Sequence, residues 1–193
     1  MTATEGIFDE VAYVYDGSLE GLLSCIFAAY ANYEQPSEVA PQTAHQQRLS
    51  QRVHRVDTNL RHAMRVRRGI TKKGGYSAYN AIRMASCSSR TDAGTAAYAF
   101  ARYVMDEHVG KRRPFSNIAH EKVAPLHAIC RSVDQESEHM RQFIRFEHLR
   151  GSDADFWFAK CNPRDSVVPL VMPHFVERFN VQPFVIYDEA HGI

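Results

Sequence analysis

The residues of this sequence with the strongest chemical signal are basic, and they are concentrated in one window. From Arg48 to Lys73 there are nine lysines or arginines and a single acid, Asp57, while the whole chain of 193 residues has a net charge of +1. A series of guanidinium and ammonium groups can neutralise phosphates and release their counterions, which gives a salt-dependent affinity that is largely independent of base sequence. We therefore predict a nucleic-acid-binding surface made of Arg48, Arg52, Arg55, Arg61, Arg65, Arg68, Lys72, Lys73 and Tyr76.

The spacing of these residues indicates how they would be presented. Arg61, Arg65, Arg68 and Lys72 recur every three or four residues, which is the period of one side of a helix. Tyr76 follows directly, and an aromatic ring beside a basic groove can stack on an unpaired base. The alternative is that the basic residues form a solvated helix face that acids elsewhere in the fold balance.

A second, weaker constellation could support acid–base chemistry. His174 and Glu177 are about one helical turn apart after Pro173, and Asp188 ends a later strand. A histidine beside a carboxylate can act as a general base, so these three residues are the candidate catalytic groups. The alternative is structural: His174 would hydrogen-bond to the backbone, and Arg178 would pair with Glu177 or Asp188.

Motifs for cofactors, metals and nucleophilic catalysis are missing from the sequence. There is no P-loop, no glycine-rich dinucleotide fingerprint, no radical-SAM cysteine triplet and no nucleophile elbow around Ser18. Glu136 and His139 have the spacing of a carboxylate–histidine metal half-site, but no other glutamate has a histidine three residues later. The four cysteines include no C-x-x-C pair, which fits a reducing cytoplasm. We expect no metal, no cofactor and a cytoplasmic protein.

Length and composition limit the class of protein further. A chain of 193 residues suits one well-buried core better than two full domains. No apolar run approaches the roughly 18 to 20 residues that a membrane-spanning helix needs. The first residues, MTATEGIFDE, lack the basic and then apolar pattern of a signal peptide. We therefore expect no membrane contact and a single domain over residues 1–193.

The first two thirds of the chain are expected to be helical after one early strand. Val11–Tyr15 has the β-branched and aromatic character of a strand, and Ser18 can cap a helix that runs to about Tyr33. Residues 36–47 contain two prolines and indicate a surface connection, and residues 45–55 indicate a short helix. One further helix is expected from the Asp57–Thr58 cap to Gly69, and another over 76–85 after a break at Gly74–Gly75. A third is expected to begin after Thr91 or Asp92. A fourth is expected over 116–138, where Pro125 would kink the helix or begin another.

The period of the apolar residues changes from 3.6 to two near Gln142, which predicts strands at residues 142–148 and 155–160 joined as an antiparallel hairpin. Pro173 is expected to begin a short helix that ends at Phe179, and residues 184–187 a last strand. The predicted fold class is α+β. We expect a small, mostly antiparallel sheet of about four strands, near 11–15, 142–148, 155–160 and 184–187, covered by five or six helices from the region 18–139.

Several of these segments together resemble a bacterial family described as "probable DNA metabolism protein", a domain of unknown function. The segments are YVYDGSLEGLLSCIF at 13–27, VDTNLRHAMRVRRGITKK at 56–73, FIRF at 143–146, VVPLVMPHFVERF at 167–179 and VIYDE at 185–189. The resemblance implies a role in nucleic-acid metabolism. It also implies partners, because the family is associated with a radical-SAM protein and, in fused members, with a uracil-DNA glycosylase.

The chain differs from that family at three places. Glu138–His139 replaces a His-Arg pair, Gln142 replaces a common glycine, and five residues follow Asp188 where members commonly continue. The resemblance therefore carries over no role for that pair or for a longer C-terminal tail.

Three functional hypotheses follow from the sequence. The first is an accessory protein of DNA metabolism or repair that binds nucleic acid through the basic helical surface. The second is a protein–protein adaptor for a radical-SAM or base-processing enzyme, without nucleic-acid contact. The third is an enzyme that uses His174 with nearby carboxylates. Of these, the first has the most support from charge and spacing.

Overall fold

The structure is a computed structural model, and it describes residues 10–107, 113–151 and 155–193. The chain divides into two compact units. Unit 1 comprises the described residues up to Ser86 together with Arg90–Ile129, and unit 2 comprises Cys87–Ser89 together with Cys130–Ile193. The single domain expected over residues 1–193 stays a prediction.

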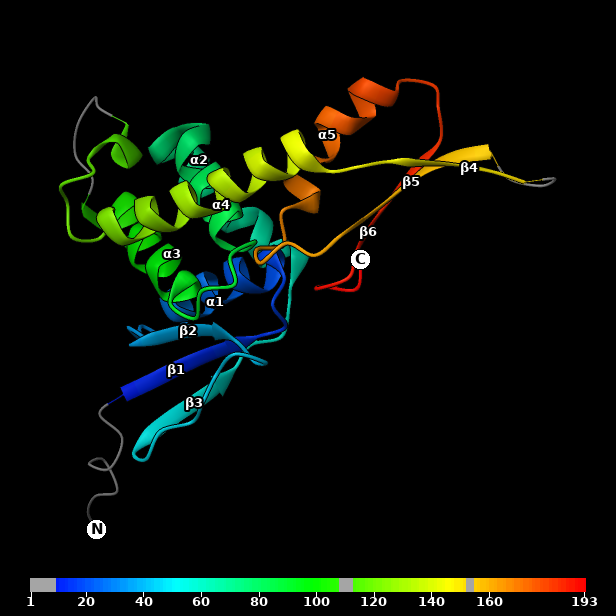
Figure 1. The fold of residues 1–193 in the computed structure, drawn as a ribbon. Helices are drawn as coiled ribbons and strands as arrows, with labels where there is room; N and C mark the ends of the chain where they lie inside the picture. The colour runs from blue at the N-terminus through cyan, green and yellow to red at the C-terminus, as the bar shows by residue number, and fades with distance from the viewer. Residues whose placement is uncertain (1–9, 108–112, 152–154) are drawn as a thin grey trace, which may run out of the picture. The chain divides into compact units, whose positions relative to one another are not determined.

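Unit 1 contains a three-stranded sheet in which all strands are parallel. The strands are β1 (Glu10–Tyr15), β2 (Glu38–Pro41) and β3 (Gln51–Arg55), in the order β2-β1-β3. The central strand β1 is buried from Ala12 to Tyr15, and Figure 1 shows helices α1 and α3 on one side of the sheet. Parallel strands require crossover connections, so this sheet is held together by contacts that are distant in sequence.

Two expectations for this region are wrong. Residues 36–47 are not only a surface connection, because they contain β2, and residues 45–55 contain β3 where a short helix was expected. Both are short edge strands that follow polar sequence, and such edges carry little of the apolar alternation by which strands are recognised. Pro41, which has no N–H to donate, is the last residue of its strand, where that loss is tolerated.

The helices of unit 1 begin close to the expected positions. They are α1 (Leu19–Ala31), α2 (Leu60–Ala85) and α3 (Ala93–Arg102), followed by a π-helical turn, η1 (Tyr103–Glu107), a 3-10 turn, η2 (Pro114–Ser116), and the first residues of α4. The Ser18 hydroxyl accepts a hydrogen bond from the Gly21 N–H at 2.9 Å, so the predicted cap of α1 is confirmed. For α2 the capping side chain is Asn59, which accepts from the first N–H groups of the helix, in place of the expected Asp57–Thr58 pair.

Helix α2 is broken at the predicted Gly74–Gly75 break, and it does not end at Gly69 as expected. Gly75 has φ +79° and ψ 175°, which is not helical. The Arg67 guanidinium carbon lies 4.8 Å from the centre of the Tyr79 ring, although twelve residues of straight helix would separate their positions by about 18 Å. The helix is therefore kinked at Gly75, and the side chains of its two halves come together across the kink.

We expect Gly75→Ala to lower the stability of the protein because of its backbone conformation alone. A Cβ at this position would meet nothing within 4 Å, but the positive φ is unfavourable for an L-residue by about 1 to 2 kcal/mol. The midpoint of urea unfolding, followed by far-UV circular dichroism, should fall accordingly. A variant as stable as the wild type would contradict the left-handed backbone conformation at this residue.

Unit 2 contains the remaining helices and a mixed sheet. Helix α4 (Ala124–Phe143) enters from unit 1, and β4 (Glu147–Arg150), β5 (Asp155–Cys161), α5 (Val168–Phe179) and β6 (Phe184–Asp188) follow. Strands β4 and β5 form the expected antiparallel hairpin, whereas β6 pairs with β5 in parallel. Pro125 lies at the start of α4, so the second of its two predicted roles is the correct one.

The C-terminal boundaries also differ from two expectations. Residues 142–148 are not one strand, because α4 continues to Phe143 and β4 begins only at Glu147. Pro173 lies inside α5, which begins at Val168, and it does not begin the helix. The fold class is α+β, as predicted. Within the described residues it has five α-helices and two three-stranded sheets, one parallel and one mixed, so the mostly antiparallel sheet of about four strands is corrected. None of the described helices combines the length and the apolar character needed to cross a membrane.

Candidate functional site

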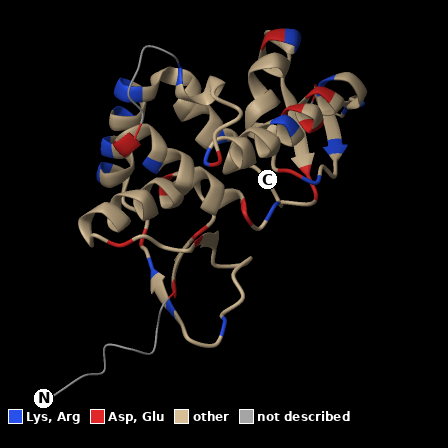
Figure 2. Cartoon of the chain, turned by 90° about the vertical axis from the view of Figure 1, so that its left-hand side faces the viewer, with Lys and Arg blue, Asp and Glu red and all other residues tan. Residues whose placement is uncertain are grey.

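The basic residues on the first half of α2 are exposed together. Arg61, Arg65, Arg68 and Lys72 are all exposed, and we call these four residues the α2 basic face. In the part of the chain that the structure describes, no ion pair with a carboxylate involves any of them. Figure 2 shows several blue segments along one side of the helices at the left of the view. These four residues therefore form one solvated helix face, and none of them has an ion-pair partner among the described carboxylates.

The N-terminal end of the α2 basic face contacts helix α1. A rise of about 1.5 Å per residue spreads its four cationic groups over about 16 Å of helix. The Arg65 guanidinium lies 5.2 Å from the centre of the Phe27 ring of α1, and His62 stacks on the same ring with centroids 3.9 Å apart. Arg55, at the end of β3, is also exposed.

An exposed tyrosine lies where the first half of α2 ends. Tyr76 follows the break at Gly75, and 64% of its surface is exposed. Its ring centre is 6.2 Å from that of Tyr79, whose ring also faces Arg67. The aromatic side chain expected beside the basic face is therefore accessible at the corner of α2.

Arg52 and Lys73 are exposed, but each is bound to another group of the protein. Arg52 pairs with Glu34, and the other oxygen of that carboxylate accepts a hydrogen bond from the Tyr13 hydroxyl at 2.6 Å. Burial and the Glu34 hydrogen bond raise the pKa of Tyr13 to about 12. The Tyr13 hydrogen bond holds the pKa of Glu34 below its usual range, with burial opposing it and Arg52 adding to it. Lys73 donates to the Met105 carbonyl oxygen. Each of these two cations thus has a partner within the protein, and their predicted role in binding stays a prediction.

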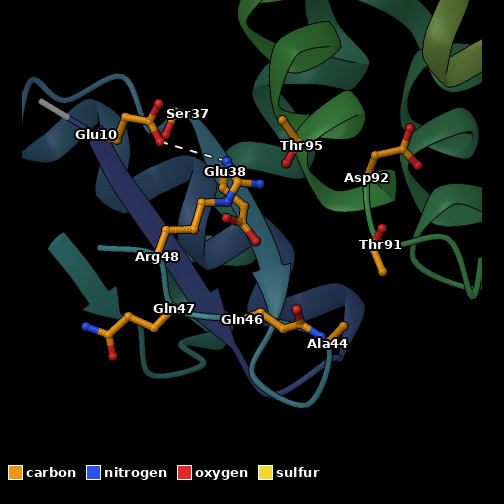
Figure 3. Close-up of a pocket in the computed structure, with 10 residues that line it drawn as sticks. All are labelled: Glu10, Ser37, Glu38, Ala44, Gln46, Gln47, Arg48, Thr91, Asp92 and Thr95. Carbon is orange, nitrogen blue, oxygen red and sulfur yellow. Dashed lines mark ion pairs between the residues drawn. The ribbon is translucent and has the colours of Figure 1, made fainter. Parts of the chain in front are cut away.

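Arg48 faces a different part of unit 1. Its guanidinium is 4.0 Å from the Glu10 carboxylate, and Figure 3 shows its side chain extended toward Glu10 and Glu38 at one side of a polar pocket of about 600 Å³. Thr91 and Thr95 of the α3 region line the opposite side of this pocket. Arg48 lies on the loop before β3, so the structure does not place it on the α2 helix.

A carboxylate–histidine pair beside this pocket was missed by the sequence reasoning. The Glu38 carboxylate contacts His45 Nδ1 at 3.1 Å, and Gln51 Nε2 donates to its other oxygen at 3.1 Å. Burial raises the pKa of Glu38, but these two hydrogen bonds outweigh burial and hold it below its usual range. The pair joins β2, β3 and the loop between them. Because the sequence pattern predicted neither β2 nor β3, it gave no indication that Glu38 and His45 would meet.

The candidate catalytic residues of unit 2 lie on two different elements, α5 and the end of β6. His174 and Glu177 are exposed on α5, whereas Asp188 is fully buried at the end of β6. The Asp188 carboxylate accepts from the Ala190 and His191 N–H groups and pairs with the His191 imidazole at 2.7 Å. Among the described residues no hydrogen bond or ion pair connects Asp188 with the two helix residues. The geometry thus gives Asp188 a structural role in the C-terminal turn.

The Glu136–His139 spacing leads to no metal cluster. Glu136 accepts a hydrogen bond from the Arg164 N–H at 3.0 Å, and the His139 ring packs on Phe143 with centroids 4.8 Å apart. In residues 10–107, 113–151 and 155–193, no group of three or more potential metal ligands is found. All four cysteines are free thiols, and burial raises the pKa of Cys25 and of Cys130 to about 12.

Comparison with known proteins gives one finding. The model of a family described as a domain of unknown function, DUF4130, matches residues 91–193, which is more than half of the chain, and the chain therefore belongs to that family. The match covers α3, α4, α5 and the mixed sheet, and it begins after the α2 basic face. No curated protein and no solved structure matches the sequence.

Proposed function

We propose that this protein binds nucleic acid through the α2 basic face, as an accessory protein of DNA metabolism or repair. One observation carries the proposal: four exposed cations at helical spacing have no carboxylate partner among the described residues, while Arg48, Arg52 and Lys73 are held by other groups. A resemblance to a DNA-metabolism family supports the biological setting. We also propose a radical-SAM protein or a uracil-DNA glycosylase as a partner.

The physical basis of the proposed binding is neutralisation of phosphates. A phosphate backbone offers closely spaced negative charges and a condensed layer of counterions, and each protein cation that replaces a counterion makes binding more sensitive to salt. Arginine suits this role because its guanidinium binds phosphate in a bidentate manner and stays charged at all relevant pH values. Contacts of this kind position the ligand without reading its bases.

Removing three of the arginines tests the proposal. We expect R61Q/R65Q/R68Q to weaken binding of a DNA oligonucleotide by about 30-fold at low salt and to lower the slope of log K against log salt by about three. Fluorescence anisotropy of a labelled oligonucleotide over a salt series measures both quantities.

The matched control removes the same three charges elsewhere. R131Q/R141Q/R150Q changes exposed or half-exposed arginines of unit 2, so it reproduces the change in net charge without touching α2. Equal losses in the two triple variants would contradict a specific role of α2. An α2 variant that binds like the wild type would favour the alternative function, an adaptor without nucleic-acid contact.

A further inference from the structure

A second candidate site lies entirely within unit 2 and shares no lining residue with the α2 basic face. It is a pocket of about 550 Å³ between the α4–β4 connection, β5 and the end of α5. Its lining residues are Ile144, Arg145, Phe146, Trp157, Arg178, Phe179 and Gln182. Three aromatic rings and two arginines thus share one cavity.

The aromatic wall of this pocket is built from rings that hold one another in place. Phe146 and Phe179 have centroids 4.5 Å apart, and Trp157 is 5.9 Å from Phe179. Two rings outside the lining add further contacts: Phe184 stacks on Phe179 at 5.0 Å, and His148 stacks on the Trp157 indole at 4.5 Å with an interplanar angle of 9°. Rings fixed in this way present a preformed surface for a planar ligand, because little side-chain freedom is lost on binding.

The backbone beneath these rings is tied to the mixed sheet. The Trp157 N–H donates to the Pro183 carbonyl at 2.9 Å, and the Gln182 N–H donates to the Phe179 carbonyl at 2.9 Å. Trp157 also pairs with Phe184 in the parallel register of β5 and β6. The pocket is therefore positioned by β5 and the end of α5, and the α4–β4 connection completes its lining.

The charge of the pocket is positive. Arg145 and Arg178 are both exposed, and the Arg178 guanidinium carbon lies 5.7 Å from the centre of the Phe179 ring. No aspartate or glutamate lines the pocket, and no ion pair within the described part of the chain involves either arginine. Two guanidinium groups without carboxylate partners favour an anionic ligand, and phosphate oxygens match their bidentate geometry.

We propose that this pocket binds a nucleotide unit, with the base against the aromatic wall and the phosphate on Arg145 and Arg178. A nucleobase offers a π-face to the rings and a polar edge within reach of a side-chain amide such as that of Gln182. Inorganic phosphate would leave the aromatic wall unused, and an uncharged aromatic ligand would leave both arginines unused. The unit can be a free nucleotide or an unpaired nucleotide of a strand, and the site is independent of the α2 basic face.

The chain contains its own reporter for this proposal. Trp157 is the single tryptophan of the 193 residues, so intrinsic tryptophan fluorescence reports on this pocket alone. We expect thymidine monophosphate and adenosine monophosphate to quench the fluorescence saturably. Thymidine should bind about tenfold more weakly or worse, because it lacks the phosphate that the arginines bind. Inorganic phosphate should leave the fluorescence unchanged.

Matched variants separate this site from the α2 basic face. R145Q/R178Q should weaken the nucleotide by about tenfold or more and leave thymidine unaffected, since only the phosphate contact is lost. The control R131Q changes an exposed arginine of α4 outside the pocket, and it should titrate like the wild type. R61Q/R65Q/R68Q should also leave mononucleotide quenching unchanged, even where it abolishes binding of long DNA.

Mononucleotides and oligonucleotides distinguish the two possible sources of the nucleotide unit. Quenching by mononucleotides identifies a free nucleotide as a ligand of the pocket, and quenching only by oligothymidylate identifies an unpaired nucleotide of a strand. Either result supports the proposal when R145Q/R178Q weakens it. The proposal is overturned if no nucleotide or oligonucleotide quenches Trp157 saturably, or if R145Q/R178Q binds as tightly as the wild type.

Discussion

Replacement of Gly94 by alanine is expected to destabilise unit 1 by about 3 kcal/mol, because it forces a methyl group into the backbone of the neighbouring strand. A Cβ at residue 94 would lie 2.3 Å from the carbonyl oxygen of Val39 in β2. The approach of helix to strand is close because Thr95 binds the same edge residue. The Val39 N–H donates to the Thr95 hydroxyl at 3.0 Å, and that hydroxyl lies 3.3 Å from the Val39 carbonyl. Neither partner can move aside as a flexible side chain would.

A second glycine provides the matched control for that prediction. Gly69 is also inside a helix, and a Cβ there would come within 3.1 Å only of the terminal carbon of Met105, a flexible side chain. Gly69→Ala should therefore be neutral or stabilising by up to about 1 kcal/mol, the usual difference in helix propensity. Urea unfolding followed by far-UV circular dichroism compares the two variants. If both behave alike, the close approach of α3 to β2 is wrong.

The second large effect is expected at Asp165, a carboxylate that sequence reasoning did not single out. Its side chain is 1% exposed, and it accepts hydrogen bonds from the Ser89 N–H and the Ser89 hydroxyl, both at 2.9 Å, and pairs with Arg164 at 3.2 Å. Asp165→Ala removes all three interactions and should lower the free energy of unfolding by about 3 kcal/mol. Because Trp157 lies in the same unit, the loss is measured by tryptophan fluorescence during urea unfolding.

The charge of Asp165 also gives the effect a dependence on pH. Burial raises the pKa of this carboxyl, but the two Ser89 hydrogen bonds and Arg164 outweigh burial and hold it below its ordinary value. A carboxyl with a lowered pKa in the folded state stabilises the protein above its unfolded pKa of about 3.9, and this contribution is lost as the pH falls through the folded pKa. Asp165→Asn keeps the shape and removes the charge.

The pH measurement compares the wild type with Asp165→Asn. The wild type should lose more stability than the variant between about pH 5 and the folded pKa of Asp165. Other carboxyls with lowered pKa values, such as Asp16 and Glu34, contribute equally to both proteins and cancel in the difference. Parallel stability curves for the two proteins would contradict a charged Asp165.

The parts of the fold that sequence patterns predicted are those with local causes. Helix α1 is rich in apolar residues and has its own serine cap, only four residues separate β4 from β5 in the sequence, and Gly75 imposes its own backbone break. Strands β2 and β3 have no such local signal, because their partner is β1, distant in the chain. The alternating apolar residues of FIRF at 143–146 led to a wrong prediction of a strand. These residues join the end of α4 to β4, and Phe146 packs against Phe179.

In the candidate site, too, the features with local causes were predicted and those that depend on the tertiary fold were not. Helical spacing predicted that Arg61, Arg65 and Arg68 share one exposed face, since that property depends only on α2 itself. It could not predict that Arg52 is taken up by Glu34, because an ion pair between a strand and a distant segment depends on the tertiary fold. For the same reason the aromatic–arginine pocket of unit 2 had no sequence signature: its lining residues come from three separate segments.

The assignment of Cys87–Ser89 to unit 2 bears on how this protein can be dissected. This tripeptide lies between α2 and α3 in sequence, yet Ser89 is bound by Asp165 and the Cys87 carbonyl accepts from the Ser166 N–H at 2.8 Å. Neither unit is therefore one continuous stretch of polypeptide. A recombinant fragment cut at the family boundary, residue 91, would retain Asp165 and lose the serine that satisfies it. Such a fragment should be an aggregation-prone, partly folded polypeptide, and a graft that restores the tripeptide should improve it.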